Sequence, residues 1–190
     1  MYTPKNFSSL LGIPGLSDSL LLNHFTLYEG YVKNTNLLIE KLASSETGTP
    51  EYTELKRRFG WEFNGMRLHE LYFDNITAEQ IMEKDSPLKQ KLSHQFGTIE
   101  AWEKDFRATG AMRGIGWVVL VYDKPSNQFT NSWINEHDIG FLAGTTPLLV
   151  MDVFEHAYIG DYGIKRGDYI EAFFHMIDWK KVSERFDLCS

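Results

Sequence analysis

The stretch MDVFEHAY, residues 151–158, places an aspartate and a histidine four positions apart, directly after an apolar run. The preceding residues, PLLVM at 147–151, have the length and composition of a buried strand. Such a strand rarely ends in two polar groups without a partner, because burying an unpaired charge costs roughly several kcal/mol or more. Two arrangements would hold Asp152 and His156: a bound metal ion, or the capped start of a helix.

The composition is that of a globular protein with an acidic balance of charge. The chain has 190 residues, of which 43% are hydrophobic, and its formal net charge is -7. This length suits one large domain or two small ones that share a core. The acidic charge argues against nucleic acid or an anionic membrane as a partner, because both attract basic surfaces.

Cysteine content and the opening sequence bear on the compartment. The single cysteine, Cys189, excludes an intrachain disulfide. The opening MYTPKNFSSLLGIPG lacks a basic segment followed by a long apolar core, and no stretch approaches the ~18 apolar residues of a membrane span. We therefore expect neither an export signal nor a membrane span, and we expect a cytoplasmic protein.

The first half of the chain has the pattern of two long helices. Ser17 or Asp18 can cap a helix that runs through LLLNHFTLYEGYVKNTNLLIEKL, where apolar residues recur at intervals of three and four. A second helix is predicted over YTELKRRFGWEFNGMRLHELYFDNI, whose middle is weakened by Gly60 and Gly65, so a bend or break there is an open alternative. The polar connection between them indicates an antiparallel helical hairpin.

The second half mixes helices with strands. Helices are predicted over SPLKQKLSHQF, over IEAWEKDFRATGA with Thr98 as its cap, and over RGDYIEAFFHMIDW. GWVVLVYD, QFTNSWI and PLLVMDV are predicted strands, the first two joined as a hairpin. The expected fold is α+β: an N-terminal helical hairpin in residues 1–84, and a C-terminal domain in residues 85–190 with a three-stranded antiparallel sheet flanked by helices.

Two histidines on the predicted hairpin change the interpretation of MDVFEHAY. His24 shares a helix face with Tyr28 and Tyr31, and His69 lies one turn before an aromatic pair. Taken singly, each is most simply a core histidine with a hydrogen-bond partner. Together with Asp152 and His156, they form a set of three imidazoles and one carboxylate that suits iron or manganese, and zinc accepts the same kinds of donor.

Several segments in the same order resemble one family. DVFEHAYIGDYGIKRGDYIEAFFHMIDWKKV is similar to the signature and following tail of the iron/manganese superoxide dismutases. FNGMRLHELYFDNI resembles the helix of the second metal ligand, FGTIEAWEKDF the helix between the domains, and RGIGWVVLVYD the start of a strand. The resemblance extends from about Ser17 to Val182.

The resemblance implies a metal site and a substrate. It implies that one iron or manganese ion per chain is held by four side chains and one solvent molecule, and that superoxide is the substrate. Tyr31 matches the tyrosine that gates the substrate channel. The implied metal ligands are His24, His69, Asp152 and His156.

The resemblance also implies roles around the site. Glu155 matches a glutamate that reaches the partner's ligand histidine across a homodimer interface. His137, or with less support Glu136, matches the residue that hydrogen-bonds the metal-bound solvent. Arg166 matches an arginine near the channel, although its position also suits a surface charge at a helix start. Trp117, Trp133 and Phe154 would form an apolar wall.

The chain departs from the family's pattern at the first ligand and at the channel. His24 precedes Tyr31 by seven residues where the family has eight, so a gapless alignment would put Asn23 at the ligand position. We prefer His24, because the loss of one residue from a wide helical turn restores a regular helix. The family histidine in between is replaced by Leu27 or Tyr28, and we expect Tyr28 to take over its channel position.

Further departures keep two other functions open. Ile159 replaces the family tyrosine that pairs with the missing histidine across the dimer, Phe154 replaces a tryptophan and Gly167 replaces a proline. The first alternative is therefore a metal-binding, dismutase-like scaffold with weak or no dismutase activity. The second is a non-haem iron oxygenase, which needs two histidines, one carboxylate and at least two open positions. A fourth protein ligand argues against it.

Overall fold

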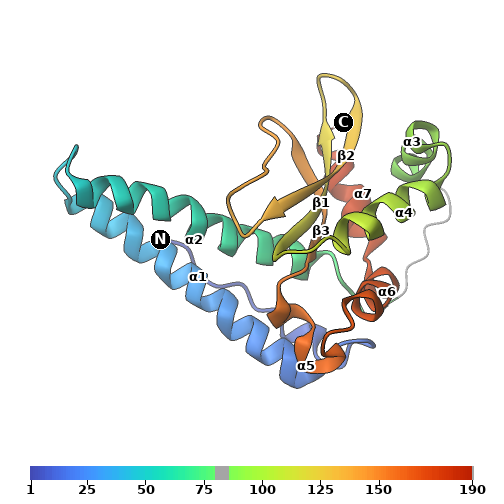
Figure 1. Cartoon of the computed structure of the whole chain (residues 1–190), viewed down its shortest axis with the longest axis horizontal. Coiled ribbons are helices and arrows are strands. Elements are labelled where there is room, and N and C mark those ends of the chain that lie inside the picture. The colour runs from blue at the N-terminus through green and yellow to red at the C-terminus, as the bar shows by residue number, and fades with distance from the viewer. Residues whose placement is uncertain (80–85, 190) are drawn as a thin grey trace.

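The structure is a computed structural model that describes residues 1–79 and 86–189 (Figure 1). Its N-terminal part is a hairpin of two long helices, α1 (Asp18–Ser44) and α2 (Pro50–Asp74), which lie side by side and extend away from the sheet. Ser17 caps α1 by accepting a hydrogen bond from the Leu20 backbone at 3.2 Å. The predicted hairpin is confirmed, and the predicted boundary between residues 84 and 85 lies outside the described residues.

The break considered within the second helix does not occur. Helix α2 continues through both Gly60 and Gly65. A Cβ atom on Gly60 would meet no heavy atom within 4 Å, whereas a Cβ atom on Gly65 would lie 2.6 Å from Cδ1 of Tyr31. The absence of a side chain at Gly65 therefore leaves room for the Tyr31 ring to pack on the backbone of α2. Helix propensity cannot reveal this packing role.

The second half contains one antiparallel sheet in the order β2-β1-β3. Its strands are β1 (Gly116–Asp123), β2 (Gln128–Asn135) and β3 (Thr146–Asp152). In the pairing of β1 with β3, Trp117 lies opposite Asp152. The end of the central strand therefore faces the aspartate of the predicted metal site.

Helices surround this sheet, as predicted. They are α3 (Pro87–Phe96), α4 (Ile99–Gly110), the short α5 (Ile159–Tyr162), α6 (Arg166–Met176) and α7 (Trp179–Asp187). A single helix predicted over residues 166–179 was wrong in its extent, because Asp178 caps a new helix by accepting a hydrogen bond from the Lys181 backbone at 3.0 Å. Among residues 1–79 and 86–189, no helix is long and apolar enough to cross a membrane.

The core joins both halves of the chain. Met66 and Tyr72 on α2 are buried in the same hydrophobic cluster as Trp117 on β1 and Phe173 on α6. The ring of Tyr72 stacks on that of Phe173 with centroids 6.1 Å apart. The C-terminal end of the hairpin is thus packed against the sheet and α6, and the predicted α+β fold is confirmed.

Candidate metal centre

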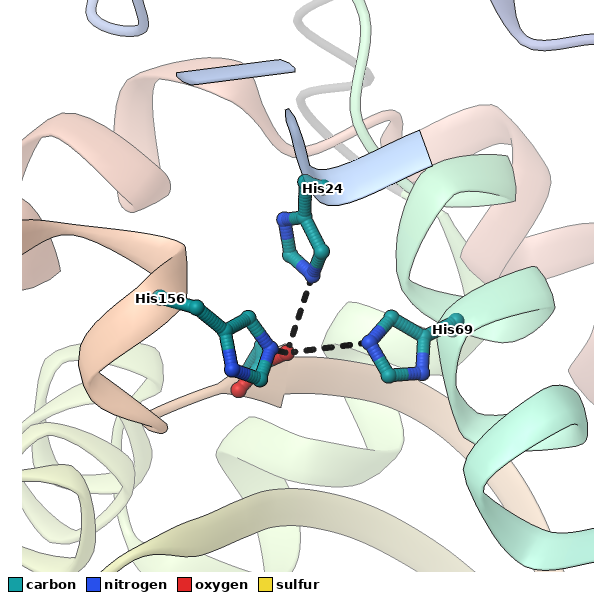
Figure 2. Close-up of side chains that lie close together, drawn as sticks. His24, His69 and His156 are labelled. Carbon is teal, nitrogen blue, oxygen red and sulfur yellow. Dashed lines mark hydrogen bonds and ion pairs between the residues drawn. The ribbon is translucent and has the colours of Figure 1, made fainter. Parts of the chain in front are cut away.

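Four side chains from four separate elements meet where the hairpin joins the sheet. His24 comes from α1, His69 from α2, Asp152 from the end of β3, and His156 from a short 3₁₀ turn, Glu155–Ala157. Figure 2 shows the three histidines pointing toward one another. One ligand atom from each of the four residues lies within 4.8 Å of the other three.

The carboxylate of Asp152 lies at the centre of this group. Its Oδ2 atom is 3.2 Å from Nε2 of His24, 3.1 Å from Nε2 of His156 and 3.7 Å from Nε2 of His69. Its Oδ1 atom accepts a hydrogen bond from the Phe154 backbone at 2.8 Å. The hydrogen bond from Phe154 orients the carboxylate so that Oδ2 faces the histidines.

The site is almost completely enclosed. His24, His69 and Asp152 are each 1% exposed or less, and the side chain of His156 is 28% exposed. Burial lowers the pKa of both His24 and His69, which favours neutral imidazoles. Burial by itself raises the pKa of Asp152, but the neighbouring histidines lower it below its ordinary range, so the carboxylate stays ionised. Neutral nitrogen donors around one anionic oxygen suit a cation.

The hydrogen bonds of His69 identify the nitrogen that is available to a metal. Its Nδ1 atom lies 2.6 Å from the carbonyl oxygen of Gly65, which can only accept, so Nδ1 carries the hydrogen. Its Nε2 atom is buried and has no hydrogen-bond partner among the described residues. Buried polar atoms are nearly always satisfied, so this bare nitrogen fits a metal ligand.

A directed pair of hydrogen bonds lies beside this group of four side chains. Trp117 donates from Nε1 to Nδ1 of His137 at 3.0 Å, so the hydrogen of the neutral imidazole is on Nε2. Nε2 therefore donates to the hydroxyl oxygen of Tyr31 at 2.8 Å. Burial lowers the pKa of His137 to about 4 and raises that of Tyr31 to about 12. Both groups are neutral near pH 7, and the Tyr31 hydroxyl keeps its own hydrogen for a further partner.

Aromatic rings line this region. Phe154 stacks on His137 with centroids 4.7 Å apart, and Trp117 meets His69 edge to face at 4.9 Å. Trp133 was also expected in this wall, but it lies on β2 against Gly114. Trp61 contacts His137 edge to face at 4.9 Å, and sequence reasoning missed it. Its spacing of eight residues before His69 on the same helix was the available signal.

Two other residues predicted for the site have partners elsewhere. The Tyr28 hydroxyl donates to Glu70 at 3.0 Å and accepts from the Lys5 backbone at 3.0 Å, while its ring centroid lies 6.4 Å from that of His69. Arg166 donates to the carbonyl oxygens of Met112 and Gly114, both at 2.7 Å, and to the hydroxyl of Tyr158 at 3.2 Å. Its guanidinium therefore braces the chain that leads into β1.

The structure also bears on the two remaining sequence alternatives. Asn23 is exposed, whereas His24 is buried against the other three site residues, so the ungapped alignment does not give the site residue. Glu136 is half-buried at the end of β2, whereas His137 is fully buried and bonded to Tyr31. Glu155 is exposed and borders an open depression with Ile159 and Ile164.

Comparison with known proteins gives one family throughout. Residues 84–185 match the C-terminal domain of iron/manganese superoxide dismutases. A manganese superoxide dismutase of Haloferax volcanii is 37% identical over 177 residues, which cover 92% of this chain and 88% of the relative. The iron superoxide dismutase of Cupriavidus metallidurans is 37% identical over 180 residues (92% and 90%), and that of Aquifex pyrophilus is 35% identical over 193 residues (97% and 90%). The chain belongs to the iron/manganese superoxide dismutase family.

Proposed function

We propose that this protein is a superoxide dismutase that uses one iron or manganese ion per chain. The observation that carries the proposal is the meeting of three imidazoles with one ionised carboxylate in a member of this family, with burial lowering the pKa of His24 and His69. Two superoxide ions and two protons would give one oxygen and one hydrogen peroxide. The residues proposed to hold the ion are His24, His69, Asp152 and His156.

The ligand set suits a metal that changes oxidation state in place. When bound, the ion supplies one-electron chemistry by alternating between its trivalent and divalent states. The four ligands come from elements packed in one core, so they hold their geometry while the charge at the site changes. Four protein ligands leave room for a solvent molecule and for the substrate.

The second role we propose is proton supply by Tyr31 and His137. Peroxide formation consumes two protons for each pair of superoxide ions. The Tyr31 hydroxyl keeps its hydrogen near neutral pH and accepts a hydrogen bond from His137, which orients it. Trp117 fixes the imidazole tautomer by donating to Nδ1. The Phe154 ring, stacked on His137 and 5.2 Å from the His156 ring, keeps bulk water away.

The third element of the proposal is a homodimer in the cytoplasm, with an antioxidant role. Glu155 is exposed and adjacent in sequence to the ligand His156, which suits a contact with the corresponding ligand of a second copy. The surrounding depression includes the exposed side chains of Ile159 and Ile164, which are 48% and 96% exposed. A two-fold axis near Glu155 would bury both.

A second candidate is a metal-binding, dismutase-like scaffold with weak or no activity. The observation that favours it is the altered channel: Leu27 is 36% exposed, and the hydroxyl of Tyr28 is already bound to Glu70. Neither side chain supplies a free imidazole at that position. This candidate shares the metal site but predicts little turnover.

The test measures metal content and superoxide decay on the same sample. Native protein is analysed for iron and manganese, then reloaded with each metal separately, and decay of pulsed superoxide is followed by ultraviolet absorbance. We expect close to one ion per chain and accelerated decay with at least one metal. Full metal occupancy without acceleration would support the second candidate, and a protein that binds neither ion would contradict both.

A further inference from the structure

One face of α2 leads from solvent to the metal ligand His69. Arg58, Glu62, Gly65 and His69 follow one another at intervals of four, three and four residues, which places them in a single row along the helix. The two ends of the row are eleven residue steps apart, or about 16 Å at 1.5 Å per residue. It begins at a side chain that is 56% exposed and ends at one that is fully buried.

The outer end of this row is a polarised ion pair. Arg58 binds Oε1 of Glu62 through Nε at 2.8 Å and through Nη2 at 2.6 Å. The second carboxylate oxygen accepts from the side-chain amide of Asn34 at 3.2 Å. The Glu62 side chain is 3% exposed, so the negative end of the pair points into the protein and the positive end faces water.

Contacts connect this pair to the residues beside the metal site. The guanidinium carbon of Arg58 lies 5.1 Å from the centre of the Trp61 ring, and that ring meets His137 edge to face at 4.9 Å. His137 in turn is bonded to Tyr31. Burial raises the pKa of Tyr31 and lowers that of His137, and the positive charge of Arg58 lowers both. Its field therefore reaches both groups.

The family resemblance led us to expect Arg166 near the substrate channel, but its guanidinium is bonded to other groups. Arg166 uses Nη1, Nη2 and Nε on two backbone carbonyls and a tyrosine hydroxyl. Each of the three nitrogens of its guanidinium thus has an acceptor within the protein. Arg58 differs, because its acceptor is a buried carboxylate behind it and more than half of its side chain remains open to solvent.

We propose that Arg58, anchored by Glu62, is the cation that attracts the anionic substrate toward the metal site along the Trp61 side of α2. The proposal rests on the proposed function, since the substrate is superoxide. A fixed positive charge near a reactive site raises the local concentration of a small anion and hence its association rate. Arg58 is a positioning residue, because it guides the anion and takes no part in electron or proton transfer.

The test compares variants of the metal-loaded protein at several salt concentrations. Arg58→Gln should lower kcat/KM about two- to fivefold at low ionic strength, because it removes the cation and leaves the Glu62 charge unopposed. Glu62→Gln should raise kcat/KM, and the double variant should fall between the two single variants. Arg58→Lys keeps the charge and should retain most of the rate.

Arg57→Gln is the matched control. Arg57 is adjacent on α2, has a 71% exposed side chain, and pairs with Glu54 at 3.4 Å away from the row. This variant makes the same change in net charge and should leave kcat/KM near the wild-type value. In about 1 M salt the Debye length falls to about 3 Å, so Arg58→Gln and wild type should converge.

Azide gives a readout that does not depend on turnover. This small anion binds trivalent iron and manganese, and its association rate with the metal-loaded protein is measured by stopped-flow absorbance. Arg58→Gln should slow azide association at low salt by the same factor as it lowers kcat/KM. A deficit that persists in 1 M salt, or an equal effect from Arg57→Gln, would overturn the proposal. Absence of dismutation by the wild type, with azide association still dependent on Arg58, would contradict the proposed function alone.

Discussion

At the scale of single residues, His24 is the proposed ligand whose position the sequence leaves most open. A regular helix places it on the same face of α1 as Tyr31, seven residues later, and the structure buries it beside Asp152. Asn23 points to solvent one position earlier. Asn23 is therefore an exposed neighbour against which the proposed role of the buried His24 can be tested.

Replacement of these two residues gives the first prediction. His24→Ala should reduce metal affinity by at least about 10- to 100-fold, the range for groups that only orient a ligand. Asn23→Ala should leave metal content unchanged, because its side chain is exposed. Elemental analysis after dialysis against a weak chelator measures both. Equal metal retention by the two variants would contradict the assignment of His24.

Gly65 gives the second prediction, with Gly60 as its control. Gly65→Ala should displace the Tyr31 ring, destabilise the protein by about 1 to 3 kcal/mol through overpacking, and slow dismutation. Gly60→Ala meets no neighbour and should stabilise α2 by about 0.5 to 1 kcal/mol. Urea unfolding and superoxide decay check both variants. If Gly65→Ala and Gly60→Ala changed stability by similar amounts in the same direction, the packing of Tyr31 would not depend on a glycine at position 65.

At the scale of secondary structure, sequence periodicity predicted most elements. The apolar spacing of α1 and α4 and the polar turn between β1 and β2 follow directly from local rules. The two errors had non-local or competing local causes. Gly65 suggested a break because glycine has a low helix propensity, and its packing role was hidden because the Tyr31 ring lies on another helix. Asp178 ended one helix by capping the next.

The joint between α2 and β3 carries the third prediction. Asn75 is fully buried, donates to the carbonyl oxygens of Tyr72 and Val150 at 3.0 and 3.1 Å, and accepts from the Val150 backbone at 2.8 Å. Asn75→Ala should cost about 2 to 4 kcal/mol of stability, because it leaves buried backbone groups unpaired. Asn23→Ala, on the surface, should change stability by less than about 0.5 kcal/mol. Chemical denaturation measures the difference, and near-equal values would refute the role of this joint.

At the scale of the whole molecule, buried histidines make stability depend on pH. Burial lowers the pKa of His24, His69 and His137 below the ordinary 6.5, to about 4 for His137. Below pH 6.5 the unfolded chain therefore binds protons that the folded chain does not, and stability falls as the pH decreases toward the folded-state pKa values. At pH 5 the lowered pKa of His137 alone reduces the free energy of unfolding by about 2 kcal/mol. The loss between pH 7.5 and pH 5 in urea unfolding of metal-free protein should shrink by that amount in His137→Asn, and an unchanged loss would contradict it.

Assembly provides the fifth prediction. Glu155→Ala should weaken the proposed homodimer, because it removes the side chain expected to reach the second copy. Glu46→Ala, at the exposed tip of the hairpin, should not. Sedimentation velocity across a range of concentrations measures both. A monomeric wild type, or a Glu155→Ala dimer of unchanged strength, would contradict the proposed interface.

The metal site was more predictable than its surroundings. Its four proposed ligands lie in stretches with distinctive residue types, and MDVFEHAY alone contains half of them. Trp61 and the pair formed by Arg58 and Glu62 lie in a helix whose sequence offers only spacing as a signal. Their importance depends on which helix face meets the sheet, and that is fixed by tertiary packing.

The proposed ligands lie far apart along the chain, and this separation would lengthen the lifetime of a bound metal ion. The first and last, His24 and His156, enclose most of the fold between them, so a bound ion would act as a cross-link between the hairpin and the sheet edge. Three of the four side chains are out of contact with solvent. A bound ion would therefore leave only when the hairpin separates locally from the sheet. Its exchange rate would then report the frequency of that opening, with no need for a denaturant.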